Sequence, residues 1–118
     1  MSTHQTGLTG EAHAEAHLRT LGYVTVTRRY RGEDGEIDLI MRDGDCLVFV
    51  EVKYRPRGRM GDGLMAVTPQ KRRRMTHAAI AFLTEREQWG AVVRFDVVEI
   101  TGDGLRHVRD AFPAVGAY

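Results

Sequence analysis

Cysteine is almost absent from this chain of 118 residues, in which Cys46 is the single one. One cysteine can form neither an internal disulfide nor a cysteine-based zinc site, so both are excluded. Cys46 stands in an apolar run, where we expect it to pack as a small hydrophobic side chain.

Long apolar segments are also missing. No stretch approaches the roughly 18 consecutive apolar residues of a membrane-spanning helix. The N-terminal residues 1–17 have neither the basic nor the apolar region of a secretory signal peptide. We therefore expect a cytoplasmic protein with no membrane partner.

The chain also has little net charge, because 17 Lys and Arg against 16 Asp and Glu leave a formal charge of +1. The charges are unevenly distributed, since residues 53–74 hold eight basic residues and only Asp62 as an acid. Such an asymmetry predicts that one face of the protein meets a negatively charged ligand. The basic residues of this stretch are Lys53, Arg55, Arg57, Arg59, Lys71, Arg72, Arg73 and Arg74.

Apolar residues at spacings of three and four predict two helices. The first ends near Gly22, and the second begins after Thr68 and Pro69, which suit an N-cap and a first helical position. Glu11 lies on the apolar face of the first helix, where a hydrophobic residue is expected. That face comprises Leu8, Glu11, Ala14, Leu18 and Leu21, and the face of the second comprises Met75, Ala78, Ala79, Phe82 and Leu83.

Five β-rich segments are predicted at residues 23–29, 36–42, 46–54, 91–101 and 105–108. The resulting order, α-β-β-β-α-β-β, predicts one α/β domain over residues 1–118, with a mixed central sheet flanked by helices. The connection 55–67 is expected to be a flexible basic loop, since loops of this length are usually functional or disordered.

The second and third predicted strands form a hairpin around Asp43-Gly44, a strong signal for a two-residue turn. With these two loop residues, Asp38 is expected opposite Phe49 and diagonal to Glu51. A three-residue loop would instead place Asp38 and Glu51 on opposite faces. With the two-residue loop, one face carries Glu36, Asp38, Glu51 and Lys53.

Carboxylates gathered on one face repel one another unless protons or a cation neutralise them. Mg²⁺ or Mn²⁺, held by one or two carboxylates and several waters, meets this need, and Lys53 would lie beside a metal-bound water. Glu11 is expected to join the cluster, because it lies on the apolar stripe that the first helix would press against the sheet. The alternative is the ordinary polar face of a half-solvated hairpin, although Leu47 and Phe49 on the same face favour partial burial.

Two motifs, GEIDLI at residues 35–40 and FVEVK at residues 49–53, carry a family resemblance. Further matches span nearly the whole chain, among them residues 7–14 and 94–98. The sequence resembles the YraN-like family of uncharacterised bacterial proteins, which belongs to the PD-(D/E)XK nuclease superfamily. The resemblance implies a restriction-endonuclease-like fold, similar to that of archaeal Holliday-junction resolvases.

The resemblance also implies catalytic roles. Asp38, Glu51 and Lys53 correspond to the D…(D/E)xK motif, and Glu11 corresponds to the acid carried by the first helix. In that superfamily the acids hold Mg²⁺ and the lysine assists the attacking water. The expected cofactor is therefore Mg²⁺ or Mn²⁺, with Asp38, Glu51 and Glu11 as ligands and Glu36 as a further candidate.

By this resemblance, the chain is expected to be a nuclease that hydrolyses phosphodiester bonds in DNA rather than RNA, with branched or repair intermediates as substrates. A homodimer is expected, because related resolvases cut two strands symmetrically. Two alternatives stay open, namely a non-catalytic nucleic-acid-binding module and a structural partner in a DNA-processing assembly. The residues expected to contact phosphate are Arg31, Arg55, Arg57, Arg59, Lys71, Arg72 and Arg74.

Overall fold

The computed structural model describes residues 3–61 and 67–115, and side chains from Thr9 onward. Residues 62–66 of the predicted basic loop, and the side chain of Leu8, therefore lie outside the described part. The order of elements confirms the predicted α-β-β-β-α-β-β arrangement. The elements are α1 (Thr3–Thr20), β1 (Val24–Arg31), β2 (Glu36–Asp43), β3 (Cys46–Arg55), α3 (Pro69–Glu85), β4 (Val92–Thr101) and β5 (Gly104–Phe112).

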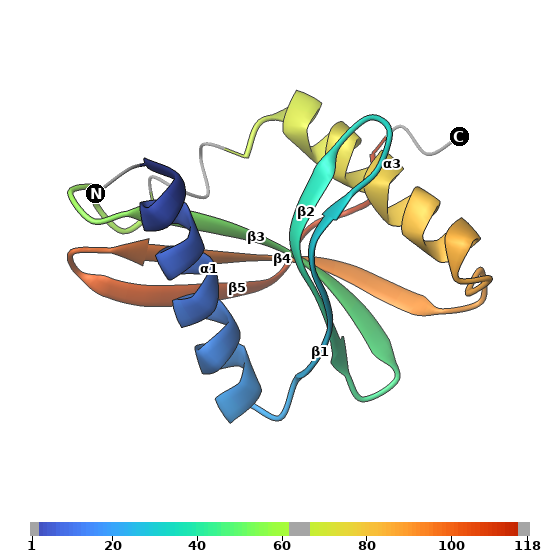
Figure 1. The fold of residues 1–118 in the computed structure, drawn as a ribbon, viewed down its shortest axis with the longest axis horizontal. Helices are drawn as coiled ribbons and strands as arrows, with labels where there is room; N and C mark the ends of the chain where they lie inside the picture. The colour runs from blue at the N-terminus through green and yellow to red at the C-terminus, as the bar shows by residue number, and fades with distance from the viewer. Residues whose placement is uncertain (1–2, 62–66, 116–118) are drawn as a thin grey trace.

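The strands form one mixed sheet in the order β1-β2-β3-β4-β5. Strands β3 and β4 pair in parallel, so α3 is the crossover that a parallel pair requires. The other neighbouring strands pair antiparallel. Figure 1 shows the strongly twisted sheet with α1 in front of it and α3 at the upper right. Within the described residues, no helix is long and apolar enough to cross a membrane.

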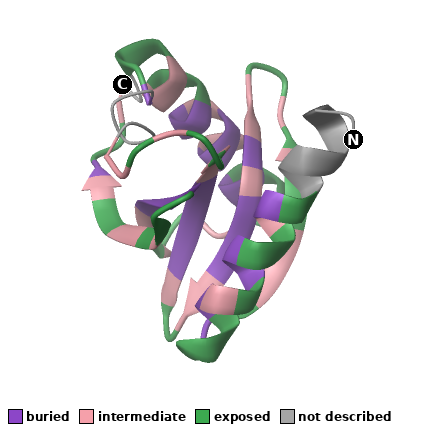
Figure 2. Cartoon of the chain, turned by 90° about the vertical axis from the view of Figure 1, so that its left-hand side faces the viewer, coloured by how far each residue is buried: buried purple, intermediate pink, exposed green. Residues whose placement is uncertain are grey.

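Each face of the sheet buries a hydrophobic layer against one helix, and Figure 2 shows the buried residues along the strands between exposed helix surfaces. Burying one large apolar side chain contributes roughly 1.5–3 kcal/mol, so these layers hold both helices on the sheet. On one face Ala14 and Leu18 of α1 pack with Leu39, Met41, Val48, Val50, Val98 and Ile100. On the other, Met75, Ala78, Ala79, Phe82 and Leu83 of α3 pack with Ile40, Leu47, Phe49, Phe95 and Val97.

The helix ends follow local sequence signals, with one exception. At α3 the prediction is confirmed, because the Thr68 side chain accepts a hydrogen bond from the Lys71 amide at 3.2 Å and Pro69 opens the helix. At α1 the expected burial of Leu21 is wrong, and its side chain is 53% exposed. The helix ends at Thr20 and Gly22 takes a φ of 92°, so Leu21 lies past the buried stripe.

The predicted register of the β2–β3 hairpin is wrong by two residues. Asp43 pairs with Cys46, so the loop residues are Gly44 and Asp45, and Phe49 lies opposite Ile40 rather than Asp38. Gly44 has a φ of 59° at the first loop position, as in type II′ turns. A shift of two residues leaves every side chain on its face, so the acids still share one.

A buried charged network joins the ends of several strands. Asp96 on β4 is fully buried and accepts hydrogen bonds from Arg94 Nε at 3.0 Å and from the Asp110 amide at 3.0 Å. His107 Nε2 lies 2.7 Å from the same carboxylate. Arg94 also donates to Asp43 at the hairpin end, at 2.9 Å. This network draws β5 past its predicted end at residue 108 to Phe112.

Candidate functional site

The candidate site lies where β2 and β3 separate. Their pairing stops at Leu39 and Val50, while β2 continues along β1 and β3 continues along β4. Asp38 is the first residue of β2 beyond this point, and its Oδ2 accepts a hydrogen bond from the Val52 amide at 2.7 Å. Figure 1 shows the two strands diverging from here. The fork leaves the carboxylates accessible to side chains from both helices.

A hollow of about 300 Å³ opens at this fork. It brings together the four residues that the sequence places in a catalytic cluster, although they come from α1, β2 and β3. Lys71 reaches the same hollow from α3. The hollow is lined by Glu11, Asp38, Glu51, Val52, Lys53, Tyr54, Arg55 and Lys71.

Glu51 is the most enclosed acid of the hollow, at 3% exposure. Its Oε1 lies 2.6 Å from Lys71 Nζ and 3.3 Å from Lys53 Nζ, so two ammonium groups share one carboxylate oxygen. Burial and the neighbouring Lys71 lower the pKa of Lys53. Burial acts in the same direction on Lys71, but Glu51 outweighs it and raises the pKa of Lys71.

Asp38 is a carboxylate without enough positive charge around it. Burial, followed by the negative charge of Glu51, raises its pKa to about 7. Glu11 shows the same direction, because burial raises its pKa while Arg29, at 3.7 Å, only partly compensates. The hollow therefore favours either protons or an additional cation.

The three-carboxylate ligand set expected for Mg²⁺ is not assembled in the structure. Among residues 3–61 and 67–115, no group of three or more His, Cys, Asp or Glu is arranged to hold a metal ion. Glu11 lies toward Arg29, and Glu36 lies 3.4 Å from Arg31 Nη2. Asp38 and Glu51 fit a hard cation as a pair, since Mg²⁺ commonly uses one or two carboxylates and keeps several waters.

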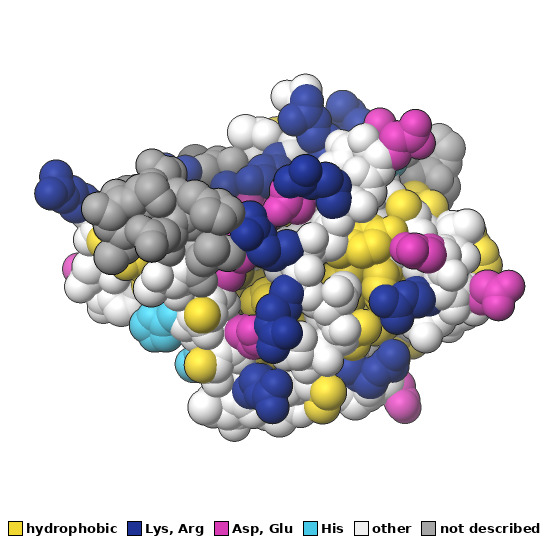
Figure 3. All heavy atoms as spheres, viewed as in Figure 1, with side chains coloured by type: hydrophobic (Ala, Val, Ile, Leu, Met, Phe, Trp, Pro, Cys, Tyr) yellow, Lys and Arg dark blue, Asp and Glu magenta, His cyan; other side chains and the backbone are white. Residues whose placement is uncertain are grey.

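A second hollow, of about 440 Å³, adjoins the first on the side of α3. Asp38, Glu51 and Lys71 line both hollows, and Arg74 adds a further cation to the second. In Figure 3 a band of Lys and Arg side chains, with acids among them, runs between the regions of α1 and α3. The second hollow is lined by Asp34, Gly35, Glu36, Asp38, Glu51, Thr68, Gln70, Lys71, Arg74 and Met75.

The other expected phosphate contacts do not line these hollows. Arg31 pairs with Glu36 beside a separate depression. The Nε of Arg72 donates to the Val67 carbonyl at 2.9 Å, and its guanidinium lies 5.1 Å from the centre of the Phe112 ring. Exposed side chains at positions 57 and 59 extend beyond the end of β3. Arg72 is thus part of the packing around α3.

The sequence profile described as "Uncharacterised protein family UPF0102" matches residues 10–100. The chain belongs to the UPF0102 family. A UPF0102 protein of Geobacter metallireducens is 40% identical over 118 residues, covering 95% of this chain and 97% of that protein. One from Alkalilimnicola ehrlichii is 43% identical over 113 residues, covering 95% of this chain and 90% of that protein. The predicted resemblance to the YraN-like family is therefore confirmed at the level of the family.

Two glycines of this UPF0102 protein set the positions of the helices beside the site. A Cβ on Gly10 of α1 would lie 2.6 Å from the Cβ of Tyr54 on β3. A Cβ on Gly35, just before β2, would lie 2.6 Å from the carbonyl oxygen of Arg74 on α3. Both distances are too short for any side chain, so the helices approach the strands closely only with glycine here.

Gly35→Ala is expected to lower the free energy of unfolding by about 1–3 kcal/mol, because the methyl group forces α3 away from β2. Gly90→Ala is the control, since a Cβ there meets nothing within 4 Å, and we expect it to change stability by less than ~1 kcal/mol. Urea denaturation measures both. Equal stability of the two variants would contradict the close approach.

Lys71 is the residue of this candidate site whose contact with Glu51 the sequence does not predict. The charge run at residues 71–74 suggests that Lys71 contacts phosphate as Arg72 and Arg74 do. Lys71, however, precedes Met75 by four residues and Ala78 by seven, so helical periodicity places it on the stripe that faces the sheet. That spacing is the available signal. Its partner Glu51 could not be named without the packing of α3.

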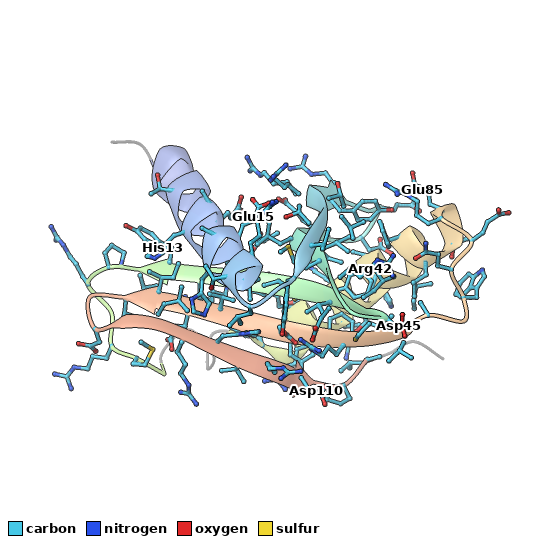
Figure 4. All side chains as sticks on the ribbon, turned by 90° about the horizontal axis from the view of Figure 1, so that it is seen from below. His13, Glu15, Arg42, Asp45, Glu85 and Asp110 are labelled. Atoms are coloured by element: carbon cyan, nitrogen blue, oxygen red, sulfur yellow. The ribbon has the colours of Figure 1, made fainter. Side chains whose placement is uncertain are left out.

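Glu15 follows Glu11 by one turn of α1 and lies outside the hollow at the fork. Figure 4 shows His13 and Glu15 projecting from different sides of the helix. Glu15 accepts two hydrogen bonds from Arg28, at 2.8 Å each, and one from the Thr25 hydroxyl. These bonds fix α1 to β1 and so help to hold Glu11 at the fork.

Proposed function

We propose that this UPF0102 protein is a nuclease of the PD-(D/E)XK type that hydrolyses phosphodiester bonds in DNA with the help of Mg²⁺ or Mn²⁺. The observation that carries the proposal is the pair of half-buried Asp38 and buried Glu51 at the fork, with Lys53 beside them. An ordinary polar hairpin face would leave such carboxylates in water, where their pKa values stay low.

Phosphodiester hydrolysis needs a positioned water and stabilisation of negative charge on the phosphoryl oxygens. Asp38 and Glu51 would hold the divalent cation, which would supply Lewis acidity and lower the pKa of a bound water. Lys53 orients the attacking water or stabilises the developing charge, and its lowered pKa suits a role in proton transfer. Arg55 and Arg74 hold flanking phosphates at the two hollows.

Cleavage of labelled DNA tests the proposal directly. Duplex, single-stranded, flap and four-way-junction DNA are incubated with the protein in Mg²⁺, Mn²⁺ or EDTA, with RNA of the same sequence for comparison. We expect metal-dependent cleavage of DNA, strongest on branched substrates if two copies act symmetrically. Binding should weaken steeply with salt, because phosphate contacts release counterions.

Absence of cleavage on every substrate would overturn the enzymatic proposal. Salt-sensitive binding retained in that case would favour the non-catalytic module. The variant Lys53→Met tests whether cleavage by the wild type comes from this site. It should abolish cleavage while leaving most of the DNA binding at the exposed arginines.

A further inference from the structure

We propose that Lys71 is a built-in counter-ion of Glu51, which occupies this carboxylate until a divalent cation displaces it. This inference rests on the metal site of the proposed function. It assigns Lys71 a positioning role that differs from phosphate contact, and it predicts that metal binding and the Lys71–Glu51 ion pair exclude each other.

The contacts of Glu51 identify the competing groups. Lys71 Nζ is 2.6 Å from Oε1, closer than Lys53 Nζ at 3.3 Å. A cation coordinated by Oε1 would require the same lone pairs that Lys71 now occupies. Because the side chain of Glu51 is 5% exposed, it cannot present its charge to bulk water instead.

The two lysines differ in their freedom to leave. The side chain of Lys71 is 39% exposed, whereas that of Lys53 is 14% exposed. Lys71 also lines both hollows, so its ammonium group has space on the side of α3 after it leaves Glu51. Its backbone stays in place because its amide donates to the Thr68 cap. Lys71 is therefore the lysine that a cation displaces from Glu51.

Exchange of this kind lowers metal affinity, since part of the binding free energy is spent on breaking the ion pair. Removing the Lys71 charge should therefore tighten metal binding. A lysine that merely supports the local fold would have the opposite effect, because its loss would loosen the carboxylates. The sign of the change thus separates the two roles.

Isothermal titration with Mn²⁺ compares the wild type with Lys71→Met and with the control Arg73→Met. The control removes the same charge from the same helical turn, at an exposed position outside both hollows. We expect Lys71→Met to bind Mn²⁺ roughly tenfold more tightly, in line with the loss of a charge in direct contact. Arg73→Met should change the affinity by less than ~2-fold, because exposed charges are screened.

Thermal unfolding in EDTA and in Mn²⁺ gives a second readout. Lys71→Met should melt below the wild type in EDTA and gain more from Mn²⁺, while Lys71→Arg should resemble the wild type. Unchanged or weaker Mn²⁺ affinity in Lys71→Met, or no Mn²⁺ binding by either protein, would overturn the inference.

These outcomes are distinct from those of the cleavage assay. Tighter Mn²⁺ binding by Lys71→Met without DNA cleavage by the wild type would support the counter-ion role and contradict the nuclease. Cleavage by the wild type with no gain of affinity in Lys71→Met would do the reverse.

Discussion

Asp38→Asn is expected to abolish DNA cleavage and, in the same protein, to raise the stability of the metal-free fold at pH 8. Loss of a cation ligand should lower activity more than ~100-fold, beyond the cost of losing a group that merely supports a ligand. The stability gain follows from the cost of holding a charged Asp38 in a half-buried site beside Glu51. The asparagine side chain of the variant would retain an oxygen for the Val52 amide, so the fork keeps its hydrogen bond.

The pH dependence of this gain has a definite sign. The pKa of Asp38 rises from 3.8 to about 7 on folding, so the folded state holds its proton more tightly than the unfolded chain. The free energy of unfolding of the wild type therefore falls as pH rises from about 4 to about 7, by an amount on the order of 2–4 kcal/mol. The asparagine variant does not share this loss. Its advantage should grow across that interval and stay constant above it.

Urea denaturation in EDTA at pH 5 and pH 8, together with the cleavage assay, measures both effects. Asp34→Asn serves as the matched control, because Asp34 is exposed and lines only the second hollow. The control should keep its activity. Because it retains Asp38, its free energy of unfolding should not increase from pH 5 to pH 8. An Asp38→Asn protein that is less stable than the wild type at pH 8 would show that Asp38 stabilises the fold by ion pairing instead.

Asp96→Ala is expected to lower the free energy of unfolding by about 3–5 kcal/mol, the usual cost of removing one partner from a buried charged network. The change leaves the guanidinium of Arg94, the His107 ring and the Asp110 amide without the acceptor that they share. Arg94 keeps Asp43 and the Tyr23 hydroxyl as partners, so the loss stays within this range.

Acid should reproduce part of this effect. Burial opposes ionisation of Asp96, but His107 and Arg94 outweigh it and lower the pKa of the carboxylate. The stabilisation is therefore present above the ordinary pKa near 3.8 and is lost as pH falls below it. Asp96→Asn should flatten the stability profile in this acidic range, which denaturation at pH 3 and pH 6 would reveal.

Asp45→Ala is the control for the Asp96 variants, because Asp45 lies exposed at the hairpin tip (Figure 4). We expect it to change stability by no more than ~0.5 kcal/mol. The Asp96 network lies apart from the two hollows, so the folded fraction of Asp96→Asn should bind metal as the wild type does. Equal stability of Asp96→Ala and Asp45→Ala would mean that the network contributes nothing measurable.

Local signals in the sequence were enough to predict the order of elements and which strand residues line the hollow of the candidate site. The N-cap of α3 and its buried stripe follow from neighbouring residues, and the structure confirms them. The placement of Asp38 and Glu51 on one face survived a wrong register, because strand side chains repeat every two residues and the shift was two. A shift of one would have destroyed the prediction.

Only the tertiary structure decided where the strands separate and what reaches Glu51. The fork depends on β1 and β4 holding β2 and β3 apart beyond Leu39 and Val50. The contact of Lys71 with Glu51 depends on the packing of α3 against Gly35. Chain periodicity determines which side of an element a residue faces. Contacts between residues far apart in sequence require the packing of whole elements, which no local pattern contains.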